Sequence, residues 1–377
     1  MASEVTTLRM GDVIELRDEV NLDNASYPVL GLNKDKSFMP TVANLSEVNL
    51  QKYKIVKKGW FAYSGMQTGR DECIRIAHYS AEHPALISPA YTTFTIKTEV
   101  NGHKISPDYV FMIFNREESD RYGAFISDSS VRANLDWPRF CDIEIPVPDI
   151  ETQQRLVDVW AGLDDMKRDN GAQAAPLMEL CMSYLKKLRS EYPLVAIGRF
   201  ILPIDERNSD EEFGETSVRG IATSKQFIET KANMEGVSLA PYKKVTPNKF
   251  AYVADTSRRG DKMSLAYNDS SETFLVSSIS SVFGLDNESD LLPEYLYLWF
   301  LRPEFDRYAR FHSWGSARET FNMDDMKRVR IPIPPKKIQQ AIVDIYTCAK
   351  ESQEIGRAAD LLRQQVGPAL IQKAMHP

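Results

Sequence analysis

Apolar and small residues recur every third or fourth position in two long segments, one near the middle of the chain and one at its end. This spacing keeps them on one helix face, and over about five heptads it predicts a coiled-coil seam. A helix of ~40 residues is ~60 Å long at its usual rise. The positions are Leu156, Val159, Leu163, Met166, Leu177, Leu180 and Tyr184, with Asn170 and Gln173 between them, and Ile338, Ala341, Ile345, Cys348, Ser352, Ile355, Ala359, Leu362, Val366 and Ala369.

The two helices pair with each other, or alternatively each lies separately on its own domain. Pro176 and Pro368 fall inside the segments, and we expect each proline to kink its helix.

Ahead of each long segment, short runs of β-branched and aromatic residues are separated by Gly, Asn, Asp and Pro. Such runs predict strands, for example over residues 91–97 and 273–279. Each β-rich region precedes a helix that starts at a proline, from Pro107 to about Arg121 and from Pro293 to about Arg310. We interpret the aromatic stripe of these helices as core. The pattern therefore predicts an α+β domain before each long helix.

The two halves of the chain repeat each other. Ile145-Pro-Val-Pro precedes a Gln-Gln pair, and Ile331-Pro-Ile-Pro precedes another about half the chain length later. We call the offset from Ile145 to Ile331 the repeat spacing. Other residues match at the same spacing: Pro107 with Pro293, Asp120 with Asp306, Phe125 with Phe311, Ser130 with Ser316, and Arg132 with Arg318. A spacing this constant indicates duplication of a complete unit.

The repeat sets the domain boundaries. We expect a first α+β domain at residues 1–150, its helix at 151–192, a second domain at 193–335 and its helix at 336–377. Each proline-rich stretch is an extended exit from a sheet, because proline cannot donate to a β-ladder or continue a helix.

Composition is that of an ordinary globular chain, with 43% hydrophobic and 26% charged residues among 377. The absence of a long apolar run or an N-terminal apolar stretch predicts a cytoplasmic location. The four cysteines and five histidines lack metal-ligand spacing, so we expect neither a metal nor a disulfide. The net charge of −7 weighs slightly against a nucleic-acid ligand.

With its two domains, each ending in I-P-[IV]-P-x-x-x-x-Q-Q and a long helix, the chain resembles the specificity subunit of Type I restriction–modification systems. The resemblance covers the entire chain. It implies an α+β fold with two tandem target recognition domains, joined by two antiparallel coiled-coil helices in a pseudo-two-fold repeat. It also implies a subunit without catalysis or cofactor that reads a bipartite DNA sequence. The implied partners are double-stranded DNA, two copies of an adenine methyltransferase subunit, and motor–nuclease subunits.

Catalytic motifs are missing from the sequence. It contains no G-x-G-x-x-G, no P-loop and no [DN]-P-P-[YF] for a flipped adenine. Asp149 followed by Asp165-x-Lys167 resembles a nuclease motif, but its second part lies in a predicted helix. We therefore expect a binding protein, with a protein-interaction scaffold as the alternative.

Two pairs of loops are candidates for DNA contact. The first pair follows matched strands and carries Gln67, Thr68, Gly69 and Arg70 in one copy and Ser257, Arg258, Arg259 and Lys262 in the other. The second pair carries Ser130, Arg132 and Asn134, and Ser316, Arg318 and Thr320. Hydroxyls and backbone amides suit phosphate, and Arg and Gln can read base edges.

We interpret Arg132 and Arg318 as phosphate contacts common to both copies, with an intramolecular salt bridge as the alternative. A solvated turn is the alternative for the first pair of loops. Residues that differ between the copies are candidates for sequence specificity, and they add Lys34, Lys36, Lys225 and Gln226.

At the domain–helix junctions lie Pro146, Pro148, Gln153 and Gln154, and again Pro332, Pro334, Gln339 and Gln340. An amide in the first helical turn can bind backbone groups of the neighbouring domain. We expect the glutamines to fix the angle between domain and helix rather than to contact DNA.

Overall fold

The computed structural model describes residues 6–46, 48–256, 262–286, 288–315 and 319–375. The chain divides into a first unit, residues 1–170 with 354–377, and a second unit, residues 171–353. Both boundaries fall within long helices, so each unit holds one α+β domain and parts of both helices. None of the described helices is long and apolar enough to span a membrane.

The first unit is built on two four-stranded sheets, in the orders β2-β9-β6-β7 and β4-β3-β8-β5, with the pairs β1-β12 and β10-β11. Its strands are β1 Thr6–Arg9, β2 Ile14–Leu16, β3 Val29–Leu32, β4 Phe38–Pro40, β5 Lys54–Val56, β6 Phe61–Ser64, β7 Arg75–His78, β8 Ala85–Ile87, β9 Thr92–Ile96, β10 Glu99–Val100, β11 His103–Lys104 and β12 Glu144–Val147. Its helices are α1 Met10–Val13, η1 Leu50–Lys52, α2 Thr68–Asp71, α3 Pro107–Phe114, α4 Glu117–Phe125 and α5 Trp137–Cys141, followed by α6 Ile150–Glu191, which continues into the second unit.

The second unit repeats this plan with the sheet β14-β21-β18-β19 and the pairs β15-β16, β17-β20 and β13-β22. Its strands are β13 Leu194–Ala196, β14 Ile201–Ile204, β15 Arg219–Ile221, β16 Phe227–Glu229, β17 Lys243–Val245, β18 Phe250–Tyr252, β19 Leu265–Tyr267, β20 Phe274–Val276, β21 Ser281–Leu285 and β22 Arg330–Pro332. Its helices are η2 Ile197–Arg199, η3 Glu215–Ser217, α7 Pro293–Phe300, α8 Pro303–Phe311 and α9 Met323–Arg328, followed by α10 Lys336–Met375, which extends into the first unit.

The main core of each unit lies between its four-stranded β2 or β14 sheet and the proline-started helix. Tyr109 and Phe114 of α3, and Tyr295 and Phe300 of α7, have no exposed side chain surface. The aromatic stripe is therefore core, as the sequence predicted. The predicted strands at 91–97 and 273–279 are found as β9 and β20.

The prediction of a single helix after each β-region is wrong. The structure has two helices there, α3 and α4 in the first unit and α7 and α8 in the second. Arg302 is extended, with φ −76° and ψ 139°. Proline at the next position disfavours helical geometry at the residue before it, which explains this break. In the first unit the helix is interrupted at Arg116, which is also extended (φ −88°, ψ 146°) although no proline follows it.

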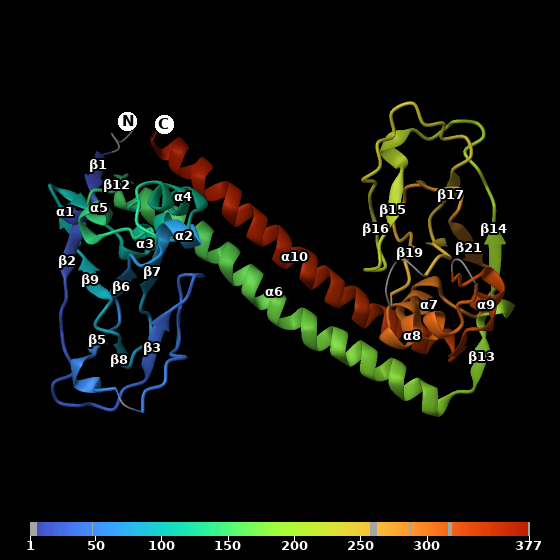
Figure 1. Ribbon diagram of the computed structural model, residues 1–377, viewed down its shortest axis with the longest axis horizontal. Coiled ribbons are helices and arrows are strands. Elements are labelled where there is room, and N and C mark those ends of the chain that lie inside the picture. The colour runs from blue at the N-terminus through green and yellow to red at the C-terminus, as the bar shows by residue number, and fades with distance from the viewer. Residues whose placement is uncertain (1–5, 47, 257–261, 287, 316–318, 376–377) are drawn as a thin grey trace. The chain divides into compact units, whose positions relative to one another are not determined.

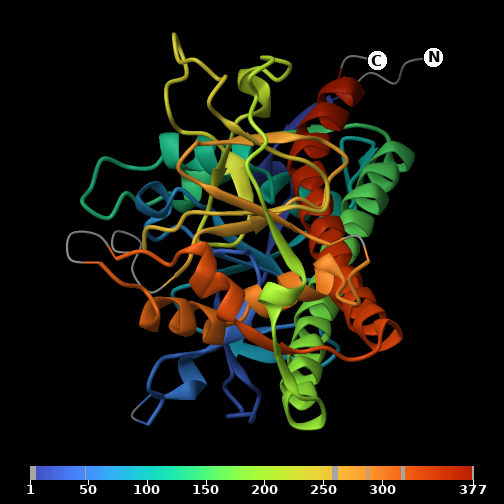
Figure 2. The same ribbon diagram turned by 90° about the vertical axis from the view of Figure 1, so that its right-hand side faces the viewer.

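The two long helices run antiparallel, side by side in both views (Figure 1 and Figure 2). In the first unit, Arg363 pairs with Asp164 at 2.5 Å and Lys167 pairs with Asp360 at 2.8 Å. In the second unit, Cys181 of α6 lies in one core cluster with Ile342 of α10. The helices thus pair with each other, and α6 continues through Pro176.

Candidate nucleic-acid interface

In the first unit, the two predicted loops lie against each other. The amide of Leu135 donates to the Gly65 carbonyl at 2.8 Å, and that of Gly69 donates to the Ala133 carbonyl at 2.9 Å. A Cβ added at Gly65 would lie 1.7 Å from the carbonyl oxygen of Leu135, so this approach requires glycine. The structure therefore joins residues 64–71 and 127–135 into one surface, which we call the first loop surface.

The tip of this surface is shaped by Asp128. Its carboxylate accepts hydrogen bonds from the amides of Ser130 and Asn134, both at 3.0 Å, and from the Ser130 hydroxyl at 2.5 Å. These hydrogen bonds, the hydroxyl first, hold the pKa of Asp128 below its usual range. Asn134 in turn accepts from the amide of Gln67 at 2.9 Å, which ties the tip to the other loop.

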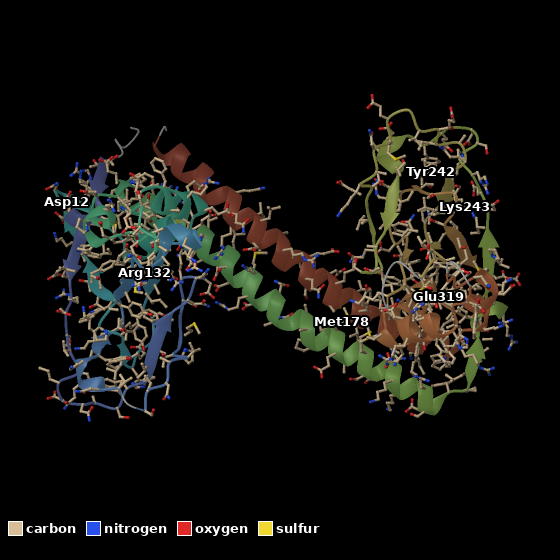
Figure 3. All side chains as sticks on the ribbon, in the orientation of Figure 1. Asp12, Arg132, Met178, Tyr242, Lys243 and Glu319 are labelled. Carbon is tan, nitrogen blue, oxygen red and sulfur yellow. The ribbon has the colours of Figure 1, made fainter. Side chains whose placement is uncertain are left out.

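Arg132 lies exposed at this tip (Figure 3), beside the fully exposed Val131. Within the described residues Arg132 makes no ion pair, which disfavours the intramolecular salt bridge considered above. Arg70 is also exposed, whereas Thr68 is buried and donates from its hydroxyl to the Gly65 carbonyl at 3.2 Å. The first loop surface thus presents two arginines on a backbone fixed by its own hydrogen bonds.

The second unit joins its corresponding loops in the same way. The amide of Phe321 donates to the Ala254 carbonyl at 2.8 Å, and that of Thr256 donates to the Glu319 carbonyl at 3.0 Å. Thr320 pairs with the exposed Trp314 through hydrogen bonds of 2.9 and 3.2 Å. We call residues 254–256 with 314–315 and 319–321 the second loop surface; Glu319 is labelled in Figure 3.

The remaining predicted DNA-binding residues do not belong to the two loop surfaces as defined above. Five of them lie outside the described residues: Ser257, Arg258, Arg259, Ser316 and Arg318. Lys262 and Gln226 are described and exposed. Lys34 is 59% exposed and pairs with Asp71 of α2 at 3.1 Å, so it borders the first loop surface; its hydrogen bond is the main cause of the lowered pKa of Asp71.

Lys36 is not exposed, contrary to what a base-reading residue requires. It is 5% exposed, with its ammonium 2.5 Å from Asp120 and 3.2 Å from the Ile74 carbonyl. Asp120 also accepts from the Ile74 amide at 2.9 Å. The pair therefore binds both the amide and the carbonyl of Ile74 and fixes the segment that follows the 64–71 loop to α4.

The second unit has a corresponding lysine–aspartate pair, and we call both pairs the clamps. Lys225, 3% exposed, pairs with Asp306 and donates to the Met263 carbonyl at 2.8 Å, while Asp306 accepts from the Met263 amide at 2.9 Å. Burial lowers the pKa of Lys225, and Asp306 acts against that shift. Neither lysine is available to DNA in this structure. The carboxylates were not singled out from the sequence, although their match at the repeat spacing was a usable signal.

At the first junction, Gln153 has no exposed surface. Its amide nitrogen donates to the carbonyls of Lys104 at 2.9 Å and Pro148 at 2.8 Å, and its oxygen accepts from the Ser106 amide at 2.9 Å. The side chain thus joins α6, the exit strand and the segment before α3, which supports a structural role.

Gln339 repeats this arrangement in the second unit, also fully buried. It donates to the carbonyls of Asp290 and Pro334, both at 2.8 Å, and accepts from the Leu292 amide at 2.9 Å. The exit strands that carry the prolines pair with the first strand of each domain, Pro146 opposite Thr7 and Pro332 opposite Leu194.

The second glutamine of each pair is exposed. Gln154 donates to Asp158 and Gln340 to Asp344, each at 2.8 Å, one turn along the same helix. Only the first glutamine of each pair therefore connects helix and domain.

The nuclease-like residues do not converge on one site. Lys167 pairs with Asp360, and Asp165 pairs with Arg168 at 2.7 Å. In the part of the chain that the structure describes, no three His, Cys, Asp or Glu side chains group as a metal would require.

Comparison with known proteins gives three results. The family model described as "Type I restriction modification DNA specificity domain" matches residues 214–350. The specificity subunit of the Type I restriction enzyme HindI from Haemophilus influenzae is 23% identical over 126 residues, 33% of this chain and 26% of the relative. The chain therefore matches about a quarter of the length of that curated relative.

The third result concerns the fold. A crystal structure of the S subunit of a Type I restriction–modification system from M. genitalium superposes with a TM-score of 0.63. It is 11% identical, and the match covers 99% of this chain and 96% of that one. The structural comparison confirms the predicted fold class, and the family model agrees with the predicted family over residues 214–350.

Proposed function

We propose that this chain, which carries the DNA specificity domain of Type I restriction–modification systems, binds a bipartite DNA sequence and recruits adenine methyltransferase subunits. Each half of the target is read by one domain, through the first and second loop surfaces. The chain itself performs no chemistry and needs no cofactor. Motor–nuclease subunits join the assembly through the methyltransferase complex.

One observation carries the proposal above all others. Backbone hydrogen bonds join the corresponding pair of loops in both domains, and each domain is fixed to its long helix by a buried glutamine at the same position. A binding domain present in two copies suits the two-fold symmetry of the DNA backbone. Arg132 and Arg70 on the first loop surface supply the charge that phosphate contact requires.

The helices supply both the spacing and the partner surface in this proposal. Six apolar residues that the heptad pattern assigned to the seam are not buried in it but remain about 40% to 50% exposed: Val159, Met166, Leu180, Tyr184, Ile355 and Leu362. Exposed apolar residues at regular helical spacing mark a surface for another protein. Two copies of a methyltransferase subunit would cover it.

The spacing role is tested by lengthening the helix pair. Seven residues are inserted between Asn170 and Gly171 of α6, with seven more between Gly356 and Arg357 of the antiparallel α10. A heptad preserves the seam and adds ~10 Å, about three base pairs of DNA. Methylation-protection mapping should show both half-sites unchanged and the spacer about three base pairs longer.

A same-length replacement of residues 167–173 is the control and should leave the spacer unchanged. If the lengthened variant methylates the original spacing, the helices do not determine that distance.

The second candidate function is a protein-interaction scaffold that does not bind DNA, which the net charge of −7 favours. The two are separated by a salt titration of DNA binding by the reconstituted complex. A scaffold would bind the methyltransferase subunit but no specific DNA at any salt concentration.

A further inference from the structure

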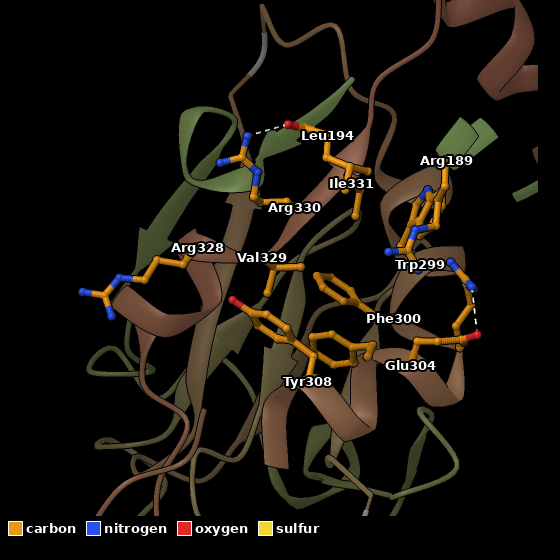
Figure 4. Close-up of a pocket in the computed structure, with 12 residues that line it drawn as sticks. Arg189, Leu194, Trp299, Phe300, Glu304, Tyr308, Arg328, Val329, Arg330 and Ile331 are labelled. Atoms are coloured by element: carbon orange, nitrogen blue, oxygen red, sulfur yellow. Dashed lines mark hydrogen bonds and ion pairs between the residues drawn. The ribbon is translucent and has the colours of Figure 1, made fainter. Parts of the chain in front are cut away.

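A pocket in the second unit lies beside the exit strand β22 (Figure 4). It has a volume of about 290 Å³. Its walls are apolar and largely buried, and include Trp299, Phe300, Val329 and Ile331. A cavity of about 150 Å³ is large enough for a benzene ring, so the pocket has room for one large apolar side chain.

A pocket of about 180 Å³ occupies the same place in the first unit. Each of its lining residues has a counterpart, at the repeat spacing, in the lining of the larger pocket. Five of these pairs are identical in type: Phe114 with Phe300, Arg116 with Arg302, Glu118 with Glu304, Tyr122 with Tyr308, and Ile145 with Ile331. The repeat has therefore kept a cavity as well as a fold.

The arginine shared by both pockets is held in place by the wall. Arg302, 6% exposed, pairs with Glu304 at 3.1 Å and lies 4.8 Å from the centre of the Trp299 ring. Arg116 donates to the carbonyl of Ile113, the counterpart of Trp299, at 3.3 Å. Each pocket thus offers a guanidinium at a fixed position beside apolar walls.

The rims differ in charge. Arg189, Arg328 and Arg330 surround the larger pocket, and Arg330 donates to the Leu194 carbonyl at 2.8 Å. The position of Arg330 is taken by Glu144 in the smaller pocket. The charge at the rim of the larger pocket therefore suits a ligand with an acidic group, and the charge at the smaller pocket does not.

A protein fits these pockets better than DNA. Among the described residues, none of those predicted to bind DNA lines either pocket. The larger pocket also shares Arg302 and Glu304 with a neighbouring groove, whose other wall is formed by Glu179, Met182, Ser183 and Lys186 of α6. A ligand that follows this groove extends from the domain along the helix, as a protein segment can.

We propose that each pocket binds one apolar side chain, aliphatic or aromatic, from one of two copies of the methyltransferase subunit, with an acidic neighbour selected by the arginine rim of the second unit. This inference rests on the proposed function, because it takes its partner from it. An occupant present in two copies explains why a cavity is kept at the same place in both domains.

The test uses the full chain mixed with the adenine methyltransferase subunit encoded beside it, with the number of bound copies measured by native mass spectrometry and affinity by calorimetry. Arg330→Glu gives the second pocket the charge found in the first, and Tyr122→Glu places a charge at the mouth of the first pocket. We expect each variant to bind one of its two copies about thirtyfold more weakly, the loss of a binding hot spot. The double variant should bind both copies weakly.

Two controls carry the same kinds of change outside the pockets. Phe125→Glu alters an exposed aromatic residue on the same helix as Tyr122, and Arg199→Glu reverses an exposed charge in the second unit. Both should bind two copies with unchanged affinity. Glu144→Arg is the converse of Arg330→Glu and should strengthen binding at the first pocket.

Folding is checked by thermal unfolding of each variant, since all substituted positions are at least partly exposed. If the unsubstituted chain binds two copies and the variants do so equally well, the pocket proposal is overturned and the proposed function stands. If variants lose DNA binding while assembly is intact, the pockets belong to DNA and the proposal is again wrong. Failure of the unsubstituted chain to bind any copy would overturn both proposals.

Discussion

The two units agree at their junctions and differ at their loop surfaces. Gln153 and Gln339 make three corresponding hydrogen bonds, each with a length of 2.8 or 2.9 Å. The first loop surface, in contrast, is organised by the carboxylate of Asp128, and the second by a backbone pairing of Trp314 with Thr320. Duplication has thus preserved what attaches and supports each domain, while the surface proposed to read DNA has diverged.

Loss of either buried lysine–aspartate pair, Lys36 with Asp120 or Lys225 with Asp306, should have the largest effect on stability. Lys36→Met or Lys225→Met leaves a carboxylate without its buried cation, which should cost about 3 to 4 kcal/mol of unfolding free energy. Urea-induced unfolding should show similar losses of unfolding free energy for both variants, because the two clamps make corresponding hydrogen bonds. Lys34→Met is the control and should cost under about 1 kcal/mol, since the Lys34 side chain is 59% exposed. A clear difference between the two losses would show that the two clamps do not contribute equally to stability.

The junction glutamines should give the next largest effect. Gln153→Ala or Gln339→Ala leaves one buried and two partly buried backbone groups without this partner, which should cost about 2 to 3 kcal/mol. The matched controls Gln154→Ala and Gln340→Ala remove only an exposed hydrogen bond to an aspartate, and should change stability by under about 0.5 kcal/mol. Equal losses at the first and second glutamines would show that the buried amide has no special role.

Arg132→Ala tests the loop surfaces and should have the smallest effect. Loss of one phosphate contact should weaken DNA binding by the assembled complex about fivefold across all sequences, and lower the salt slope by about one. Fluorescence anisotropy over a range of salt concentrations measures both quantities, with Arg155→Ala on α6 as control. A loss confined to one base pair would instead make Arg132 a sequence reader.

The fold was largely predictable because duplication provides its own internal alignment. Matches at the repeat spacing located the long helices and the exit strands. The helix breaks at Arg116 and Arg302 were missed, since an unbroken aromatic stripe outweighed one proline. Lys36 and Lys225 were assigned to DNA because a lysine in a turn is usually exposed, and sequence does not show that an aspartate 84 or 81 residues later neutralises it.

The buried glutamines have one further consequence. Every group they bind is a main-chain amide or carbonyl, contributed by Lys104, Ser106 and Pro148 in one copy and by Asp290, Leu292 and Pro334 in the other. Two of these three positions carry different side chains in the two copies, yet the geometry is the same. The attachment thus depends on the path of the backbone alone. A domain can therefore change its side chains, or be exchanged for another domain with the same backbone, without losing its attachment to the helix.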